Sequence, residues 1–133
     1  MARRFAVVAA CVSWAALAAA DPPPSRTQAL VDRGKASFNL NCAACHGVSG
    51  EGNGPVAFAV KPHPRNLRKD KFVQGDAVEQ IFATLTRGLP SGTMASYAQL
   101  SADERWALAY YVTTFRARRC LESGPGRSTD IHR

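Results

Sequence analysis

The sequence contains no stretch typical of a β-strand, and after residue 20 it has no apolar run long enough to span a membrane. Its 133 residues suffice for one modest hydrophobic core and exclude a large multidomain enzyme. Acidic residues are few, with 10 Asp and Glu against 17 Lys and Arg, so the formal net charge is +7. Hydrophobic residues make up 46% and charged residues 20%, which excludes a disordered or coiled-coil chain. The composition therefore indicates a single basic globular domain.

The first 20 residues have the order of an export signal. Residues 1–4 include two arginines, residues 5–20 are uncharged and rich in alanine, and three alanines precede Asp21. This order is typical of a secretory signal peptide with a small-residue cleavage site. We therefore predict a signal peptide over residues 1–20, a periplasmic location and a linker over residues 21–25.

Three alternatives to a cleaved general secretory signal remain open. Arg3 and Arg4 are compatible with a twin-arginine signal, Cys11 follows residues with lipobox character, and an uncleaved segment would act as an anchor. The apolar stretch is short and rich in alanine, whereas a spanning helix needs about 20 apolar residues. We expect cleavage, which leaves 15 basic and 10 acidic residues in a mature chain that does not span a membrane.

Cysteine is scarce after this segment, with only Cys42, Cys45 and Cys120. Disulfides are common in exported proteins, but three cysteines cannot all pair within one chain. Cys42 and Cys45 are separated by two residues and followed by His46, a CxxCH pattern that is the attachment signature of c-type haem. Each thiol forms a thioether with a vinyl group of the porphyrin, and the histidine binds the iron. We predict one haem c held by these three residues, with no role for Cys120.

Three other interpretations of the CxxC pair fit the sequence less well than haem attachment does. A thioredoxin-like redox pair would lie between a strand and a helix, and no strand pattern surrounds it. A zinc site would need a second pair of ligands, for which His63 and Cys120 are irregularly spaced. A plain disulfide would not require His46.

Methionine is rarer still, because Met94 is the only one left once Met1 has been removed with the signal. It lies 48 residues after His46, in a loop rich in glycine and proline between two predicted helices. We predict that Met94 is the second axial ligand of the iron. A methionine that fills a gap in the core is the plain alternative, and His63 is the rival ligand.

Three helices are expected. A capping box of the form S-x-x-Q at Ser25 predicts a helix over residues 26–39, and Asp76 with Glu79 predicts another that ends before Gly88. A box at Ser101 predicts the last helix, which carries an apolar stripe at Leu108, Tyr111, Val112 and Phe115. We assign a domain to residues 26–116 and a flexible tail to residues 117–133.

Taken in order, these features resemble the class I cytochromes c, in their soluble mono-haem bacterial form. The matching landmarks are Gly34, Phe38, CAACHG at 42–47, the glycine loop at 50–55, PRNL at 64–67, GTMASY at 92–97 and residues 106–111. The resemblance implies an all-α fold with three main helices around one covalent haem. It implies that the first and last helices cross where Gly34, Phe38 and Tyr111 meet.

The resemblance also implies roles around the haem. It suggests that the carbonyl of Pro55 accepts a hydrogen bond from the ring of His46. Arg65 and Asn66 follow the proline turn where the family often contacts the haem propionates, with ordinary solvated loop positions as the alternative. Trp106 is expected either to support the propionates or to pack the last helix.

Two protein ligands leave no open iron position for oxygen or peroxide, which favours a one-electron carrier without substrate turnover of its own. A haem-bearing subunit of a larger periplasmic redox enzyme is the alternative, followed by a gas sensor or peroxidase-like protein in which Met94 is displaceable. Expected partners are a terminal oxidase or reductase, a dehydrogenase or a quinol-oxidising complex. The basic surface favours acidic docking patches, and export argues against nucleic acid.

Overall fold

The computed structural model describes residues 22–90 and 94–122, with side chains up to residue 117. Over these ranges the chain forms four α-helices and one short 3-10 helix and contains no strand, which confirms the all-α class. The helices are α1 (Gln28–Asn41), α2 (Ala43–His46), α3 (Val78–Arg87) and α4 (Ala102–Glu122), with η1 (Ala57–Ala59) between α2 and α3. The predicted signal segment lies outside the described residues.

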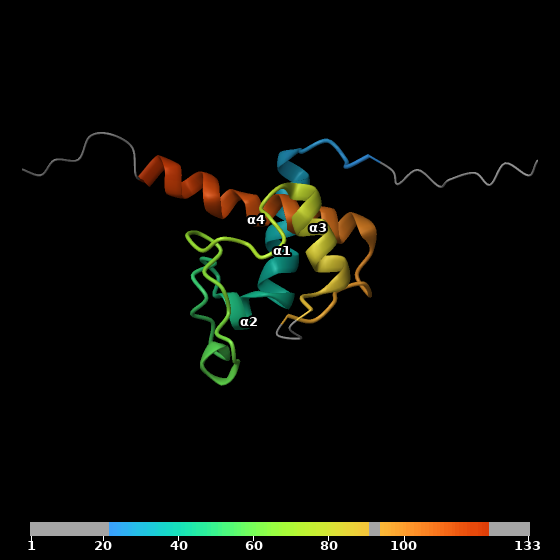
Figure 1. Cartoon of the computed structure of the whole chain (residues 1–133). Helices are drawn as coiled ribbons and strands as arrows, with labels where there is room; N and C mark the ends of the chain where they lie inside the picture. Colours follow the sequence, from blue (N-terminus) through green and yellow to red (C-terminus); the bar gives the residue numbers. More distant parts are fainter. Residues whose placement is uncertain (1–21, 91–93, 123–133) are drawn as a thin grey trace, which may run out of the picture.

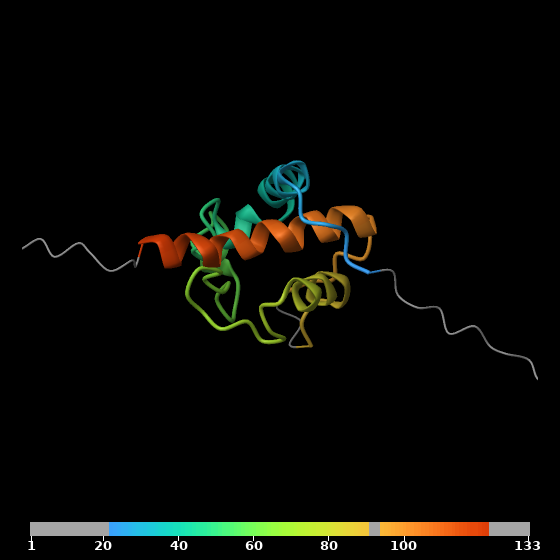
Figure 2. The same ribbon diagram turned by 90° about the horizontal axis from the view of Figure 1, so that it is seen from above.

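Helix α4 is the longest element and packs against both α1 and α3 (Figure 1). In the view from above, α1 and α3 lie on opposite sides of α4 (Figure 2). Long irregular segments connect α2 to α3 and wrap the lower part of the molecule in Figure 1.

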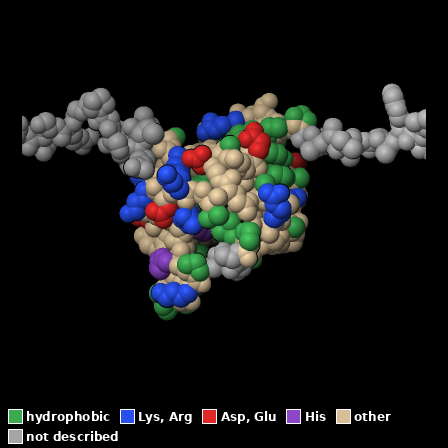
Figure 3. All heavy atoms as spheres, in the orientation of Figure 1, with side chains coloured by type: hydrophobic (Ala, Val, Ile, Leu, Met, Phe, Trp, Pro, Cys, Tyr) green, Lys and Arg blue, Asp and Glu red, His purple; other side chains and the backbone are tan. Residues whose placement is uncertain are grey.

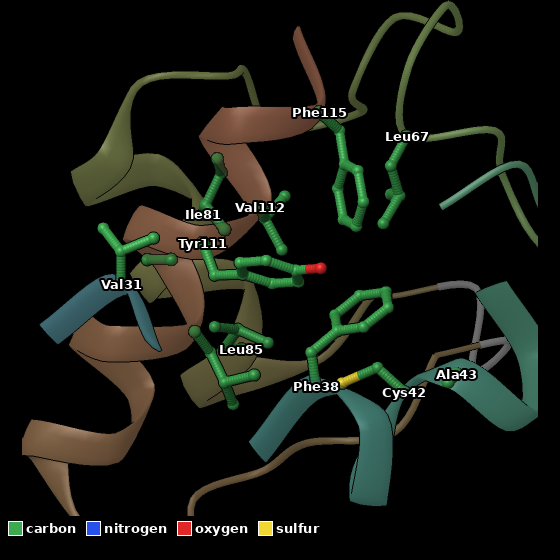
Figure 4. Close-up of a cluster of buried hydrophobic side chains, with 12 residues drawn as sticks. Val31, Phe38, Cys42, Ala43, Leu67, Ile81, Leu85, Tyr111, Val112 and Phe115 are labelled. Carbon is green, nitrogen blue, oxygen red and sulfur yellow. The ribbon is translucent and has the colours of Figure 1, made fainter. Parts of the chain in front are cut away.

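The crossing of α1 over α4 depends on a glycine. A Cβ atom added to Gly34 would lie 2.0 Å from the carbonyl oxygen of Ala107 and 2.8 Å from Cβ of Tyr111. One turn further along α1, Phe38 is fully buried, with its ring centroid 5.3 Å from those of both Tyr111 and Phe115 (Figure 4). The predicted contact between Gly34, Phe38 and Tyr111 is therefore confirmed.

Helix α3 buries Ile81 and Leu85 in the same core and presents Phe82 to α4. The rings of Phe82 and Trp106 stack with centroids 3.9 Å apart and planes 14° from parallel. Trp106 thus packs α4 against α3, one of the two roles expected for it.

Two predicted helix starts were wrong. Helix α1 begins after Thr27, whose Oγ1 accepts a hydrogen bond from the Leu30 backbone amide at 3.1 Å, so Ser25 is not the cap. Helix α3 begins after Ala77, whose backbone amide donates to Oε1 of Gln80 at 3.1 Å, so Asp76 is not the cap either. Both helices start within two residues of the predicted positions.

Other helix boundaries agree with those predicted from the sequence. Helix α3 ends at Arg87, and Gly88 follows with a φ of 73°, as predicted. The capping box at Ser101 is confirmed by reciprocal hydrogen bonds with Glu104. Helix α4, however, continues to Glu122, so residues 117–122 of the expected tail are helical. Residues 123–133 lie outside the described part of the chain.

The Ser101 cap gives a direct stability prediction. Its Oγ accepts from the Glu104 amide at 3.2 Å, and removing such a cap typically costs about 1 kcal/mol. Ser101→Ala should lower the free energy of unfolding in urea by that amount. Ser25→Ala is the matched control, because Ser25 lies outside α1 and should be neutral. Equal effects of the two changes would contradict the assignment of the cap.

Candidate functional site

A cavity of about 360 Å³ lies between the end of α1, α2, the segment 60–75, α3 and the loop that follows α3. Its size falls within the ~300–1,000 Å³ usual for small-molecule and cofactor sites. Much of its wall is apolar and either belongs to the core or packs against it, namely Phe38, Leu67, Phe72, Ile81, Leu85 and Val112. The predicted haem residues Cys42, Cys45, His46 and Met94 all line this cavity.

A single helical turn brings the CxxCH side chains together. The amides of Cys45 and His46 both donate to the Cys42 carbonyl, at 3.1 and 2.9 Å. Side chains three and four positions apart on a helix lie on the same face, so all three reach the cavity. Neither cysteine is paired in a disulfide, and burial, assisted by the nearby Cys45, raises the pKa of the Cys42 thiol to about 12.

The imidazole of His46 is oriented by the backbone of a distant loop. Its Nδ1 lies 3.0 Å from the carbonyl oxygen of Arg65. A carbonyl can only accept, so Nδ1 carries the proton and Nε2 keeps its lone pair for a metal. Burial lowers the pKa of His46, opposed by the bond to Arg65, so the ring is neutral at neutral pH as a metal ligand must be.

This geometry corrects the role expected for Pro55. The carbonyl that accepts from His46 belongs to Arg65, 19 residues further along the chain. Pro55 is exposed and lines a separate surface groove with Ala43 and Ala44. The resemblance to the class I cytochromes c implied Pro55, whereas the fold of the loop brings the carbonyl of Arg65 to the ring.

The side chains of Arg65 and Asn66 are engaged within their own loop. Arg65 lines the cavity, and its Nη1 donates to the Lys71 carbonyl at 2.8 Å. Oδ1 of Asn66 accepts from the amides of Arg68 and Lys69 at 2.9 and 3.2 Å, which builds a turn. Asn66 does not line the cavity. Contact with the haem propionates therefore stays a prediction for Arg65, whereas the position of Asn66 does not support such a contact.

Met94 and His63 both line the cavity, but their surroundings differ. Met94 is partly buried and packs against the hydrophobic core, and its carbonyl accepts from the Leu89 amide at 3.0 Å. His63 is exposed, and its Nδ1 is 3.5 Å from the carbonyl of Pro64. The packing of Met94 into the apolar wall favours it over His63 as a second ligand. Residues 91–93 of its loop lie outside the described part of the chain.

The model of the cytochrome c family matches residues 31–116 of this sequence. The chain belongs to the cytochrome c family. Members of this family are electron-transfer proteins that carry covalently attached haem c, and the CxxCH turn described above lies within the matched residues.

Two curated relatives are named as subunits of cbb3-type cytochrome c oxidases. The cbb3-type cytochrome c oxidase subunit FixP of Bradyrhizobium sp. (strain ORS 278) is 36% identical over 83 residues, which is 62% of this chain and 26% of the relative. FixP of Azorhizobium caulinodans is 41% identical over 59 residues, which is 44% of this chain and 17% of the relative. The cytochrome described here therefore spans about a quarter or less of these proteins.

A solved structure supports the fold. A chain of the reducing HAO-like protein complex of Kuenenia stuttgartiensis superposes with a TM-score of 0.66 at 33% identity. The match covers 71% of this chain and 47% of the Kuenenia chain. The cytochrome fold is thus shared over most of the described residues.

The residues around the cavity fit a haem c. Its wall offers two thiols, an imidazole with Nε2 available and a thioether, and the remainder is largely apolar, as the flat porphyrin requires. Among the side chains that the structure describes, those of His, Cys, Asp and Glu form no cluster of three or more suited to a metal ion. No helix in the described part of this cytochrome is long and apolar enough to cross a membrane.

One residue that supports the wall of this cavity was not predicted from the sequence. Arg116 belongs to α4, where its Nη2 donates to the carbonyl of Asp70 and its guanidinium lies 4.5 Å from the ring centroid of Phe72. Phe72 lines the cavity, so Arg116 holds part of the wall. The available signal was its position four residues after Val112, on the face of α4 that lines the cavity.

Proposed function

We propose that this cytochrome is an exported one-electron carrier with a single haem c, bound covalently by Cys42 and Cys45 and ligated axially by His46 and Met94. The observation that carries the proposal is the convergence of these four side chains on one largely apolar cavity. The N-terminal pattern of basic, apolar and small residues supports export to the periplasm.

Each residue has a defined task in this proposal. Nδ1 of His46 donates to the Arg65 carbonyl, which fixes the tautomer and directs Nε2 to the iron. The apolar wall, including Phe38 and Leu85, excludes water from the cofactor. When bound, haem supplies a one-electron iron couple, and a thioether ligand raises its potential relative to a second histidine. Electron transfer of this kind needs no general acid or base from the protein.

The partners in this proposal are redox proteins with acidic docking surfaces. Removal of the signal leaves 15 basic against 10 acidic residues. Lys and Arg side chains are scattered over the face shown in Figure 3, with smaller areas of acid between them. Complementary charge of this kind accelerates the encounter more than it strengthens the complex. A terminal oxidase or reductase, a dehydrogenase or a quinol-oxidising complex would fit.

Covalent attachment can be tested by extracting the purified holoprotein with acidified acetone. The colour should stay with the polypeptide, should stay partly in Cys42→Ala or Cys45→Ala, and should be extracted from the double variant. Cys120→Ser is the matched control, since it removes a thiol outside the CxxCH turn and should retain all the haem. Extractable haem in the wild-type protein, or bound zinc without haem, would refute the proposal.

A second candidate is a haem-bearing subunit of a larger redox enzyme. It is favoured by the relatives, which are named as a subunit of a cbb3-type oxidase and as a chain of a reducing HAO-like complex. Gel filtration of native periplasmic extract, followed by haem absorbance, distinguishes the two. A free carrier elutes near 14.3 kDa or slightly below it after cleavage, whereas a permanent subunit elutes with its complex.

A further inference from the structure

The segment that carries Met94 is tied to the rest of the protein on two sides. On one side it is bound to α3: the amide of Leu89 donates to the Met94 carbonyl at 3.0 Å, and the amide of Tyr97 donates to the Leu85 carbonyl at 2.7 Å. Oγ of Ser96 donates to the Thr86 carbonyl at 2.7 Å. These bonds fix the loop relative to α3 but not relative to the CxxCH turn.

On the other side, the side chain of Tyr97 connects the segment of Met94 to the end of α1, next to the CxxCH turn. The Tyr97 hydroxyl donates to the carbonyl of Asn41 at 3.0 Å, a contact between residues 56 positions apart. Asn41 ends α1 and directly precedes Cys42. The last carbonyls of a helix lack partners within the helix, so Asn41 has an acceptor available. The ring of Tyr97 lines the cavity and packs against the core.

We propose that Tyr97 is a positioning residue for the sixth ligand, because its hydroxyl fastens the Met94 loop to the CxxCH segment across the cavity. The inference rests on the proposed function, in which Met94 ligates the iron. While the hydrogen bond from Tyr97 to Asn41 is formed, the two sides of the cavity that carry His46 and Met94 are held at a fixed separation. Without it, the loop keeps only its bonds to α3 and leaves the iron more often.

The experiment compares two tyrosine variants of the holoprotein. Tyr97→Phe removes the bridging hydroxyl and keeps the ring. Tyr110→Phe is the matched control, because its hydroxyl also donates to a distant carbonyl, that of Pro24 at 2.7 Å, and Tyr110 does not line the cavity. Imidazole is titrated into the oxidised proteins, where it binds only when the methionine has left, and the far-red sulfur-to-iron band is followed.

Tyr97→Phe should increase the apparent affinity for imidazole about fivefold. This is the effect expected when the hydrogen bond from Tyr97 to Asn41, at an ordinary net strength, no longer opposes the release of Met94 from the iron. Tyr110→Phe should bind imidazole as the wild-type protein does. An unchanged affinity in Tyr97→Phe, or an equal increase in both variants, would overturn the proposal. If the wild-type protein lacks the far-red band and Met94→Ala leaves its imidazole affinity unchanged, the ligand assignment itself fails, and the role of Tyr97 fails with it.

Discussion

Gly34→Ala should destabilise the folded protein by roughly 3 kcal/mol or more, although alanine is favoured over glycine in a helix by about 1 kcal/mol. The added methyl carbon would lie 2.0 Å from the oxygen and 2.6 Å from the carbon of the Ala107 carbonyl. These are backbone atoms, so no change of side-chain rotamer can relieve the clash. Helices α1 and α4 would have to separate, which would loosen the packing of Phe38 against Tyr111 and Phe115.

Urea unfolding of the holoprotein measures this effect. Ala36→Gly is the matched control, because Ala36 is exposed on the same helix and should lose only the propensity difference of about 1 kcal/mol. Gly34→Ala should therefore be less stable than Ala36→Gly, which is the reverse of the order of stability expected from helix propensity. A Gly34→Ala protein as stable as the wild type would contradict the close approach of the two helices.

The helices could be predicted because their signals are local. The stripe from Leu108 to Phe115 identified α4, and Ser101 with Glu104 identified its start. The starts of α1 and α3 were misplaced because several polar residues near each start could act as the cap. At α1 the side chain of Thr27 forms the bond, and at α3 the side chain of Gln80 reaches back to Ala77. Propensity alone does not distinguish such neighbours.

The residues of the site were predictable to different degrees. Cys42, Cys45 and His46 form a contiguous motif, and a single helical turn suffices to bring them to one face. The partner of the His46 ring was not predictable, because it depends on long-range backbone bonds. The Leu67 amide donates to the Gly50 carbonyl at 2.7 Å, which folds the segment 50–67 back on itself. That fold brings Arg65 rather than Pro55 to the ring.

Hydrogen bonds between distant segments could not be predicted from sequence patterns. Tyr97 contacts Asn41 and Arg116 contacts Asp70, pairs separated by 56 and 46 positions. The spacing of Arg116 from Val112 indicates on which face of α4 it lies, but neither pair leaves a signal that identifies the partner, since each contact depends on how the helices and loops are packed. The residues predicted to bind the haem thus line one cavity, whereas the contacts that position them could be found only in the structure.

Met94→Ala should change the chemistry of the protein more than any other single substitution outside the CxxCH motif. A thioether is a soft ligand that favours ferrous over ferric iron, so its loss should lower the midpoint potential. The far-red sulfur-to-iron band of the oxidised protein should vanish. The vacated position lies in the apolar cavity, so the reduced protein should bind carbon monoxide, which the wild-type protein should not.

Two further variants separate ligation from packing. Met94→His should keep the iron six-coordinate at a lower potential than the wild type, and it should exclude carbon monoxide. His63→Ala is the control for the rival ligand, because His63 also lines the cavity but is exposed. It should leave the spectrum and the potential unchanged. If Met94→Ala retains the wild-type spectrum while His63→Ala loses it, the sixth ligand is His63, and the low potential of a bis-histidine haem would replace the high potential expected here.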